Sequence, residues 1–331
     1  MTTSETTLAH RHFSENEQQF SVHRGKLQMM LFDAVQQRLP QDSVLTGQQV
    51  ESLTEDAERV LVEVTDRHHD DRTVTYAAKV LIGADGVHSK VRKNFHPDAN
   101  TNNWEGTTMF RGTYRAQKPF LTGRSMVLVY GEDAKRFLTY PISREAEQEG
   151  QSLINWVAMV PQSKGKTVSE KETQNVPTDP SNVLPYFDDW GFDWLDIKTM
   201  ISGAEDVLSY PMVDRESLAS WGQGRVTLLG DTAHPMYPIG ANGGSQAIRD
   251  AVTLATYMGD TAVDGDLVQA LRNYETERIP ATTAVVEANR KLNQTERKLA
   301  NLSQEKLEEM AHNGRMDEIQ EAYAHGDFDK I

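Results

Sequence analysis

The fold of this chain is decided by one continuous stretch, which reads Arg225-Val226-Thr227-Leu228-Leu229-Gly230-Asp231-Thr232-Ala233-His234-Pro235-Met236-Tyr237-Pro238-Ile239-Gly240-Ala241-Asn242-Gly243-Gly244-Ser245-Gln246-Ala247. It begins with an apolar run typical of a parallel strand that is covered on both faces. Asp231 follows directly, and a glycine-rich loop then opens into a helical pattern. Free N–H groups and the dipole at such a helix start favour an anion. The stretch predicts a ligand site, although similar turns occur in α/β folds without one.

A second stretch of similar build lies earlier in the chain and reads Leu81-Ile82-Gly83-Ala84-Asp85-Gly86-Val87-His88-Ser89-Lys90-Val91-Arg92. Asp85 is expected at the carboxyl end of a parallel strand, where open α/β sheets bind ligands. Gly86 has no Cβ and allows a ligand to come close, and Ser89 can cap a following helix. A tight turn in which Asp85 only fixes the loop explains the same residues, so both interpretations stay open.

The region between these stretches, from about Trp104 to Val213, has a different pattern. Short strand-like segments separated by turns predict an antiparallel sheet. The segments are 107–115, 125–130, 136–142, 153–160 and 207–212. Trp190 and Trp194 are predicted to anchor the core of this region, with the border of a substrate cavity as the alternative.

Helical patterns flank this arrangement. The apolar spacing from Leu27 to Leu39 predicts an amphipathic helix that Pro40 ends. Residues from Thr282 onward predict a charged amphipathic tail helix. The prediction is an α/β fold with a doubly wound domain in residues 1–98 and 206–281. A β-sheet domain in residues 99–205 interrupts it, and residues 282–331 form a helical tail.

Composition excludes several classes of protein. The 331 residues include 34 Lys and Arg against 49 Asp and Glu, a net charge of −15 that argues against a nucleic-acid partner. The absence of cysteine excludes disulfides and thiol nucleophiles. No apolar run approaches the roughly 18 residues of a membrane span, and no signal peptide is visible, which predicts a cytoplasmic protein. The histidine-rich turn at 68–71 lacks spaced partners, so no metal site is predicted.

Both glycine-rich stretches resemble the two FAD signatures of the class A flavoprotein monooxygenases, the family of para-hydroxybenzoate hydroxylase. Further segments resemble its phenazine-modifying branch, namely Phe20–Gln28, Phe110–Arg115, Tyr140–Ser143, Asn155–Val157 and Tyr210–Arg215. The resemblance implies an FAD-dependent enzyme that hydroxylates an aromatic or heteroaromatic small molecule with NAD(P)H and O2. Two alternatives for the function remain open: a catalytically inactive remnant, and a flavin-linked reductase or dehydrogenase of the same fold. For the assembly, a homodimer stays open.

The resemblance also implies roles for single residues. Arg24 would reach the FAD phosphates or ribose, Asp85 and Gly86 would lie near the pyrophosphate, and Asp231 would bind the ribityl chain. The residues expected along the pyrimidine side of the flavin are Pro238, Gly240, Ala241, Asn242 and Gly243. The residues expected to line the substrate, between the inserted sheet and the flavin loop, are Arg111, Tyr210 and Tyr237. No catalytic base is predicted.

The sequence departs from the family in one respect. Such proteins begin with a strand, a G-x-G-x-x-G turn and a helix that hold the ADP pyrophosphate. This spacing is missing here, since Gly222 and Gly224 are followed by Thr227 where the third glycine belongs. We therefore expect an N-terminally truncated member of the family, and the FAD affinity of this chain is left open.

Overall fold

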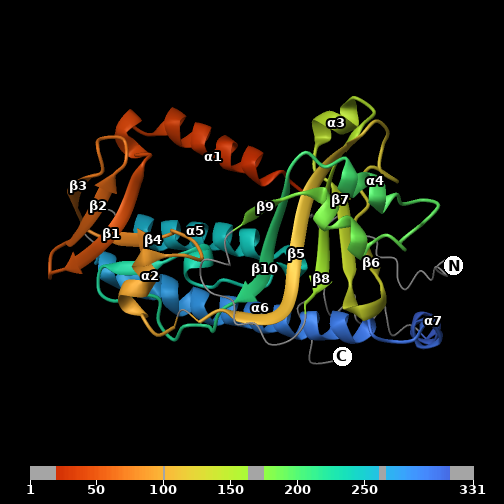
Figure 1. Ribbon diagram of the computed structural model, residues 1–331. Helices are drawn as coiled ribbons and strands as arrows, with labels where there is room; N and C mark the ends of the chain where they lie inside the picture. Colours follow the sequence, from red (N-terminus) through yellow and green to blue (C-terminus); the bar gives the residue numbers. More distant parts are fainter. Residues whose placement is uncertain (1–19, 100, 163–174, 261–265, 314–331) are drawn as a thin grey trace. The chain divides into compact units, whose positions relative to one another are not determined.

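The computed structural model describes residues 20–99, 101–162, 175–260 and 266–313 (Figure 1). The chain separates into two compact units. Unit 1 comprises Met1–Pro40, Trp104–Met212 and Asn293–Ile331, and unit 2 comprises Gln41–Asn103 and Val213–Leu292. Within the described ranges, no helix combines the length and the apolar character needed to cross a membrane. The predicted division into a doubly wound domain, an inserted domain and a tail stays a prediction.

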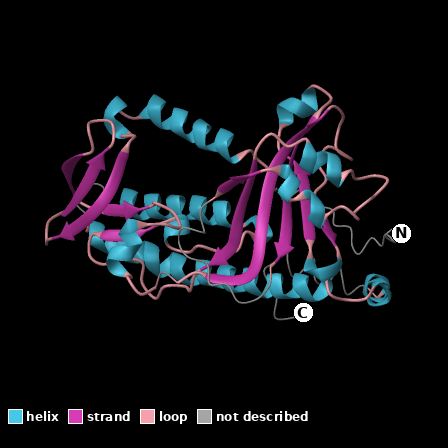
Figure 2. Cartoon of the chain, viewed as in Figure 1, coloured by secondary structure: helices cyan, strands magenta, loops and turns pink. Residues whose placement is uncertain are grey.

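Unit 1 is built on a six-stranded sheet with the strand order β6-β7-β8-β5-β10-β9, whose strands are labelled in Figure 1. Figure 2 shows strands in magenta and helices in cyan. The strands are β5 (Asn103–Ala116), β6 (Val127–Tyr130), β7 (Arg136–Pro141), β8 (Ser152–Pro161), β9 (Val176–Thr178) and β10 (Val207–Asp214). The pairs β5–β8, β6–β7, β7–β8 and β9–β10 are antiparallel, as the sequence predicts. In this register Arg111 lies opposite Val157, and Asn155 lies opposite both Thr113 and Tyr140.

The two faces of this sheet differ. Because side chains alternate along a strand, Phe110, Phe137 and Trp156 share one face, where they belong to the core of unit 1. Trp190 is part of that core, as predicted. Trp194 is not, because it is 46% exposed and its ring lies against Phe192 at the rim of the cluster. The prediction that Trp194 anchors the core is wrong.

The helices of unit 1 are α1 (Arg24–Arg38), α3 (Arg144–Gln148), α4 (Ile197–Ser202) and α7 (Gln304–His312). The predicted helix before Pro40 is confirmed as α1, and the His23 side chain caps it by accepting from the N–H of Lys26. Its apolar stripe, however, is not buried: Met30, Leu31 and Leu39 are each more than half exposed. Leu27, Ala34 and Val35 of the same stripe are half-buried.

Unit 2 contains an antiparallel sheet of β1 (Gln48–Glu55), β2 (Val60–Asp66) and β3 (Arg72–Ala78), and a parallel pair of β4 (Leu81–Gly83) and β11 (Val226–Leu228). Its helices are α2 (Lys90–Phe95) and α5 (Gly243–Asp260). The sequence predicts the parallel character of β4 and β11 but not the presence of β1. Val62, Leu228 and Tyr274 are among the buried side chains of its core.

The long helix α6 (Leu267–Leu299) begins well before the predicted start at Thr282. Pro280 lies inside it and removes one backbone donor. The helix continues across Pro280 because residues on both sides of it, such as Tyr274 and Val286, are buried. Tertiary packing therefore outweighs the local signal that suggested the later start. The predicted combination of a parallel strand pair, an antiparallel sheet and a helical C-terminal region is confirmed.

Candidate functional site

The parallel strand pair of unit 2 brings the two glycine-rich turns together. Leu228 of β11 pairs with Gly83 of β4, so both strands end at the same edge. The N–H of Gly86 donates to the Thr232 hydroxyl across 2.7 Å, although 146 residues separate them in sequence. The same hydroxyl lies 3.4 Å from Oδ1 of Asp85. The turns that carry Asp85 and Asp231 therefore meet at one end of the pair.

Asp85 has a structural role at this edge. Its Oδ2 accepts from the N–H of Lys90 at 2.8 Å and from that of Val91 at 3.3 Å, at the start of α2. Ser89 caps the same helix as predicted, with its Oγ 2.8 Å from the N–H of Arg92. Gly86 has a φ of +77°, and no atom lies within 4 Å of the position that a Cβ would take. The turn thus leaves open space beside Gly86.

Asp231 lies in the short 3-10 turn η6 (Gly230–Thr232) and is exposed. Its carboxylate accepts no hydrogen bond from any residue that the structure describes. A Cβ built on Gly243 would lie 3.8 Å from its Oδ1, which places this carboxylate beside the start of α5. Asp231 is therefore an exposed acceptor next to a helix N-terminus.

That N-terminus follows the turn η7 (Ile239–Ala241), where Gly240 has a φ of +80°. The N–H of Gln246 donates to the carbonyl of Asn242 at 2.9 Å, so the first complete helical bond of α5 starts at Asn242. No atom lies within 4 Å of a Cβ on Gly244. The start of α5 is the positive dipole end of the helix, where backbone N–H groups without intrahelical partners suit an electron-rich ligand.

A buried charge cluster, defined here as Asp250, His234 and Arg278, holds this turn and α5 together. Nε2 of His234 lies 2.6 Å from Asp250 Oδ2, and Arg278 Nε donates to Oδ1 at 2.7 Å. The N–H of Gly230 also donates to Asp250 Oδ2, at 3.0 Å. His234 must carry a proton on Nε2, because a carboxylate only accepts. Burial alone would raise the pKa of Asp250, but these hydrogen bonds and charges outweigh it and lower the pKa.

The sequence signals only part of this cluster. His234 stands inside the glycine-rich stretch, where the family resemblance favours a structural role over an acid or base. Asp250 and Arg278 lie in helices α5 and α6 and belong to no motif. A buried carboxylate in the helix that follows a glycine-rich turn is a weak signal, and only the folded chain brings Arg278 to it.

The second candidate group lies in unit 1, on the sheet face opposite the core. Arg111 of β5 donates from Nε to Oδ1 of Asn155 on β8 at 2.8 Å. Tyr210 of β10 lies beside Arg111, and burial raises the pKa of Tyr210 while the charges of Arg111 and Arg24 act in the opposite direction. In the sequence Asn155 is marked only by the family resemblance, and its contact with Arg111 is seen only in the folded chain.

The structure places the remaining predicted residues as follows. Tyr237 belongs to unit 2, is 2% exposed, and its hydroxyl lies 3.4 Å from the carbonyl of Asn103. Asn242 donates from Nδ2 to Asn289 at 3.4 Å, and Pro238 is exposed. Arg24 is exposed at the start of α1. A substrate site that unites Tyr237 with Arg111 and Tyr210 stays a prediction.

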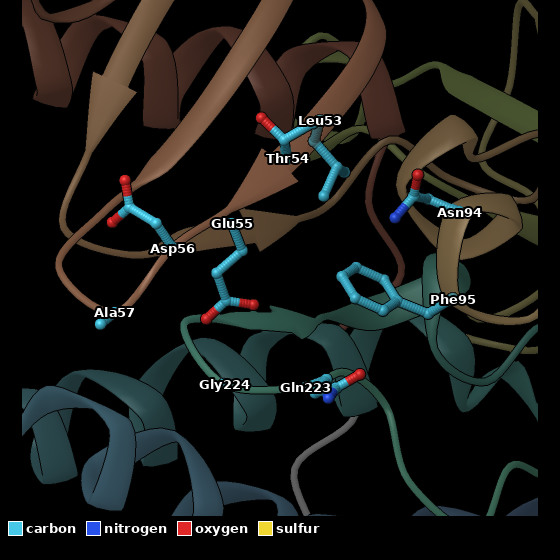
Figure 3. A pocket seen from close by; sticks show the side chains of 9 residues that line it. All are labelled: Leu53, Thr54, Glu55, Asp56, Ala57, Asn94, Phe95, Gln223 and Gly224. Carbon is cyan, nitrogen blue, oxygen red and sulfur yellow. The ribbon is translucent and has the colours of Figure 1, made fainter.

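A pocket of about 480 Å³ lies elsewhere in unit 2 (Figure 3). Its lining residues are Leu53, Thr54, Glu55, Asp56, Ala57, Asn94, Phe95, Gln223 and Gly224, which include no predicted site residue. Glu55 accepts from the N–H of Arg225, and Asp56 accepts from those of Glu58 and Arg59. Its acids already serve the surrounding turns. Among the described residues, no three His, Asp or Glu side chains cluster as metal ligands do.

Comparison with known proteins identifies the family. A family model described as "FAD binding domain" matches residues 9–183 and 198–289. The chain is 45% identical over 286 residues to phenazine 1,6-dicarboxylic acid hydroxylase PhzS of Lysobacter antibioticus, covering 85% of this chain and 68% of that protein. It is 32% identical over 209 residues to 3-amino-4-hydroxybenzoate 2-monooxygenase PtnB3 of Streptomyces platensis, covering 63% of this chain and 48% of that protein.

The fold matches solved structures as well. Klebsiella pneumoniae HpxO, in a complex with FAD and uric acid, superimposes with a TM-score of 0.67 at 24% identity. The match covers 90% of this chain and 71% of HpxO. The resemblance and the FAD cofactor read from the sequence are thereby confirmed at the level of the family. The chain belongs to the FAD-binding domain family of the class A flavoprotein monooxygenases, close to the phenazine hydroxylases.

Proposed function

We propose that this chain hydroxylates an aromatic or heteroaromatic small molecule, with NAD(P)H as reductant and O2 as oxidant. The observation that carries the proposal is the exposed carboxylate of Asp231 beside the N-terminus of α5. It occurs in a chain whose family binds FAD. The relatives named for phenazine 1,6-dicarboxylic acid and 3-amino-4-hydroxybenzoate support a planar ring as substrate.

The residues at the end of the parallel pair fit FAD. When bound, FAD would supply the redox chemistry of a hydroxylation that consumes NAD(P)H and O2, and the protein would bind and orient it. Asp231 would accept hydrogen bonds from the ribityl hydroxyls, and the open space beside Gly86 admits the pyrophosphate. The start of α5 would stabilise negative charge on the pyrimidine side of the flavin. The residues proposed there are Pro238, Gly240, Ala241, Asn242 and Gly243.

Other roles are proposed from the family. Arg24 and Asp85 would contact the phosphates or ribose of FAD, and Arg111, Tyr210 and Tyr237 would line the substrate. No residue is assigned as a base. A homodimer and a cytoplasmic location complete the proposal.

Purification of the chain and the visible absorbance of its flavin test the proposal first. FAD near one per chain, followed by NADPH oxidation, O2 uptake and a hydroxylated product, supports the hydroxylase. NADPH oxidation without oxygen, coupled to another acceptor, indicates a reductase or dehydrogenase. Failure to bind added FAD indicates a catalytically inactive remnant.

A pair of variants assigns the binding to the proposed site. Asp231→Ala removes the proposed acceptor for the ribityl hydroxyls and should weaken FAD binding about 10-fold or more, the effect of a charge-assisted hydrogen bond. Asp98→Ala, which removes another exposed aspartate of unit 2, is the matched control and should leave FAD affinity unchanged. Equal affinities for the two variants would contradict the role of Asp231.

A further inference from the structure

Arg111 and Arg136 both lie on the face of the unit 1 sheet that is turned away from its core. Arg136 lies opposite Met159, which lies opposite Met109, and Met109 shares its face of β5 with Arg111. Arg136 is fully buried and forms an ion pair with Glu296, while its second terminal nitrogen donates to Asn293 Oδ1 at 3.2 Å. This arginine is neutralised within the chain.

Arg111 is held differently. Its Nε donates to a neutral amide, Asn155, and its other described polar neighbour is the phenol of Tyr210. None of the carboxylates in the described ranges forms an ion pair with it. A half-buried guanidinium without a counter-charge is unfavourable, and an anion placed against it would restore the balance that Glu296 provides for Arg136.

Asn155 points to a ligand independently. The side chain is fully buried, and its Nδ2 has no hydrogen-bond partner among the described residues. The amide orientation is fixed, because Oδ1 must face the Nε–H of Arg111. Buried donors are almost always satisfied in native proteins, so an unpartnered one beside an unpaired cation indicates a missing acceptor.

Tyr210 adds a further donor. Its strand β10 neighbours β5, and β5 neighbours β8, so the three side chains come from adjacent strands. Burial raises the pKa of Tyr210, which keeps the hydroxyl protonated at neutral pH. A planar carboxylate has two oxygens that accept from a guanidinium fork and from neighbouring donors.

We propose that Arg111, Asn155 and Tyr210 form an anion-recognition subsite that binds a carboxylate attached to the aromatic substrate. The inference rests on the proposed function, since it assigns the substrate class of the same enzyme. It predicts that the chain selects ring acids over the corresponding neutral rings. The phosphate of NAD(P)H is the other anion at hand, and the test separates the two.

The test is equilibrium dialysis of the full chain, with and without added FAD, against phenazine-1-carboxylate and against unsubstituted phenazine. Wild type should bind the acid more tightly than the neutral ring. Arg111→Gln should weaken binding of the acid about 10- to 100-fold and leave the neutral ring unchanged. Arg115→Gln is the matched control, because Arg115 lies on the same strand but is exposed and bonds to Gln151.

A second variant removes the ambiguity of misfolding. Asn155→Asp places a carboxylate against Arg111 and reproduces the closed pairing of Arg136 with Glu296. It should abolish the preference for the acid while the thermal midpoint of unfolding stays near that of wild type. Equal weakening of acid and neutral ring, or no weakening in either variant, would overturn the proposal.

Turnover provides the remaining arms. Where the hydroxylase is active, Arg111→Gln should raise the KM for the ring acid and leave the KM for NAD(P)H unchanged. A raised KM for NAD(P)H alone would assign the subsite to the nucleotide phosphate and overturn the proposal. Because dialysis needs no turnover, acid-selective binding without hydroxylation would contradict the proposed function and leave the subsite standing.

Discussion

The buried charge cluster of unit 2 and the Arg111 group of unit 1 satisfy their charges in opposite ways. Asp250 is fully buried and receives hydrogen bonds from His234, Arg278 and Gly230. Arg111 is half-buried, and the polar groups that it contacts in the described part of the chain, Asn155 and Tyr210, are neutral. The buried charge cluster fixes the backbone of the turn before Asp231. The positive charge of Arg111, in contrast, is not compensated within the described residues and is suited to bind an anionic ligand.

The largest effect on stability is expected from a substitution in the buried charge cluster. Asp250→Ala leaves the buried guanidinium of Arg278 without its counter-charge, which typically costs about 3–5 kcal/mol of unfolding free energy. It also frees the Gly230 turn, so FAD affinity should fall with stability. Urea unfolding followed by tryptophan fluorescence measures the loss, with Asp98→Ala as the exposed control. A loss below about 1 kcal/mol would show that the cluster does not fix the turn.

The pH dependence of stability sharpens the same contrast. The folded-state pKa of Asp250 is lowered from its ordinary value of 3.8. Its stabilising contribution is therefore complete above that value and is lost as the pH falls through the lower folded-state pKa. The contribution amounts to about 1.4 kcal/mol for each unit of lowering. Urea midpoints between pH 2 and 6 should show an acid limb in wild type that is shallower in Asp250→Asn; parallel curves would contradict this.

The sequence predicts the strands and sheets that carry the two groups but not the side-chain contacts within each group. Alternating and continuous apolar runs predict the antiparallel sheet and the parallel pair, since they depend on local periodicity. The motif spacing predicts that Asp85 and Asp231 follow strands, which the structure places side by side. The pairing of Asp250 with Arg278 has no local period and depends on how α5 meets α6.

Local signals also mislead where packing decides. Pro280 sits inside α6 although proline usually ends a helix, because buried residues on both sides hold the helix together. Trp194 looks like a core residue by type, yet it lies at the rim. Asn155 looks like an ordinary strand residue until Arg111 is seen to donate to it.

Asp85 accepts hydrogen bonds within the protein, at the start of α2, and is also proposed to contact FAD. A matched pair of variants separates these two roles. Asp85→Ala and Ser89→Ala each remove an acceptor at the start of α2, so each should cost about 1 kcal/mol of stability. Only Asp85 is also proposed to face the cofactor. Isothermal titration with FAD should therefore show weaker binding for Asp85→Ala than for Ser89→Ala. Equal FAD affinities would restrict Asp85 to capping.

The smallest change in stability is expected from a substitution of Arg111. Arg111→Met breaks no ion pair and leaves one buried oxygen of Asn155 without a donor, so it should cost about 1 kcal/mol. Arg136→Met, in the same sheet, strands the buried Glu296 and should cost about 3–5 kcal/mol. Urea unfolding measures both. Comparable losses would mean that Arg111 is structural.

Wild type and Arg111→Met give a second measurement of the role of Arg111. A ligand that binds only the folded state stabilises it by about 2.7 kcal/mol at 100 times its Kd. At that concentration phenazine-1-carboxylate should raise the thermal midpoint of wild type clearly more than that of Arg111→Met, whose expected 10- to 100-fold higher Kd leaves only about 0.4–1.4 kcal/mol of stabilisation. If the variant responded as strongly as wild type, the uncompensated charge of Arg111 would have no part in ligand binding, and the distinction between the two clusters would reduce to a difference in burial.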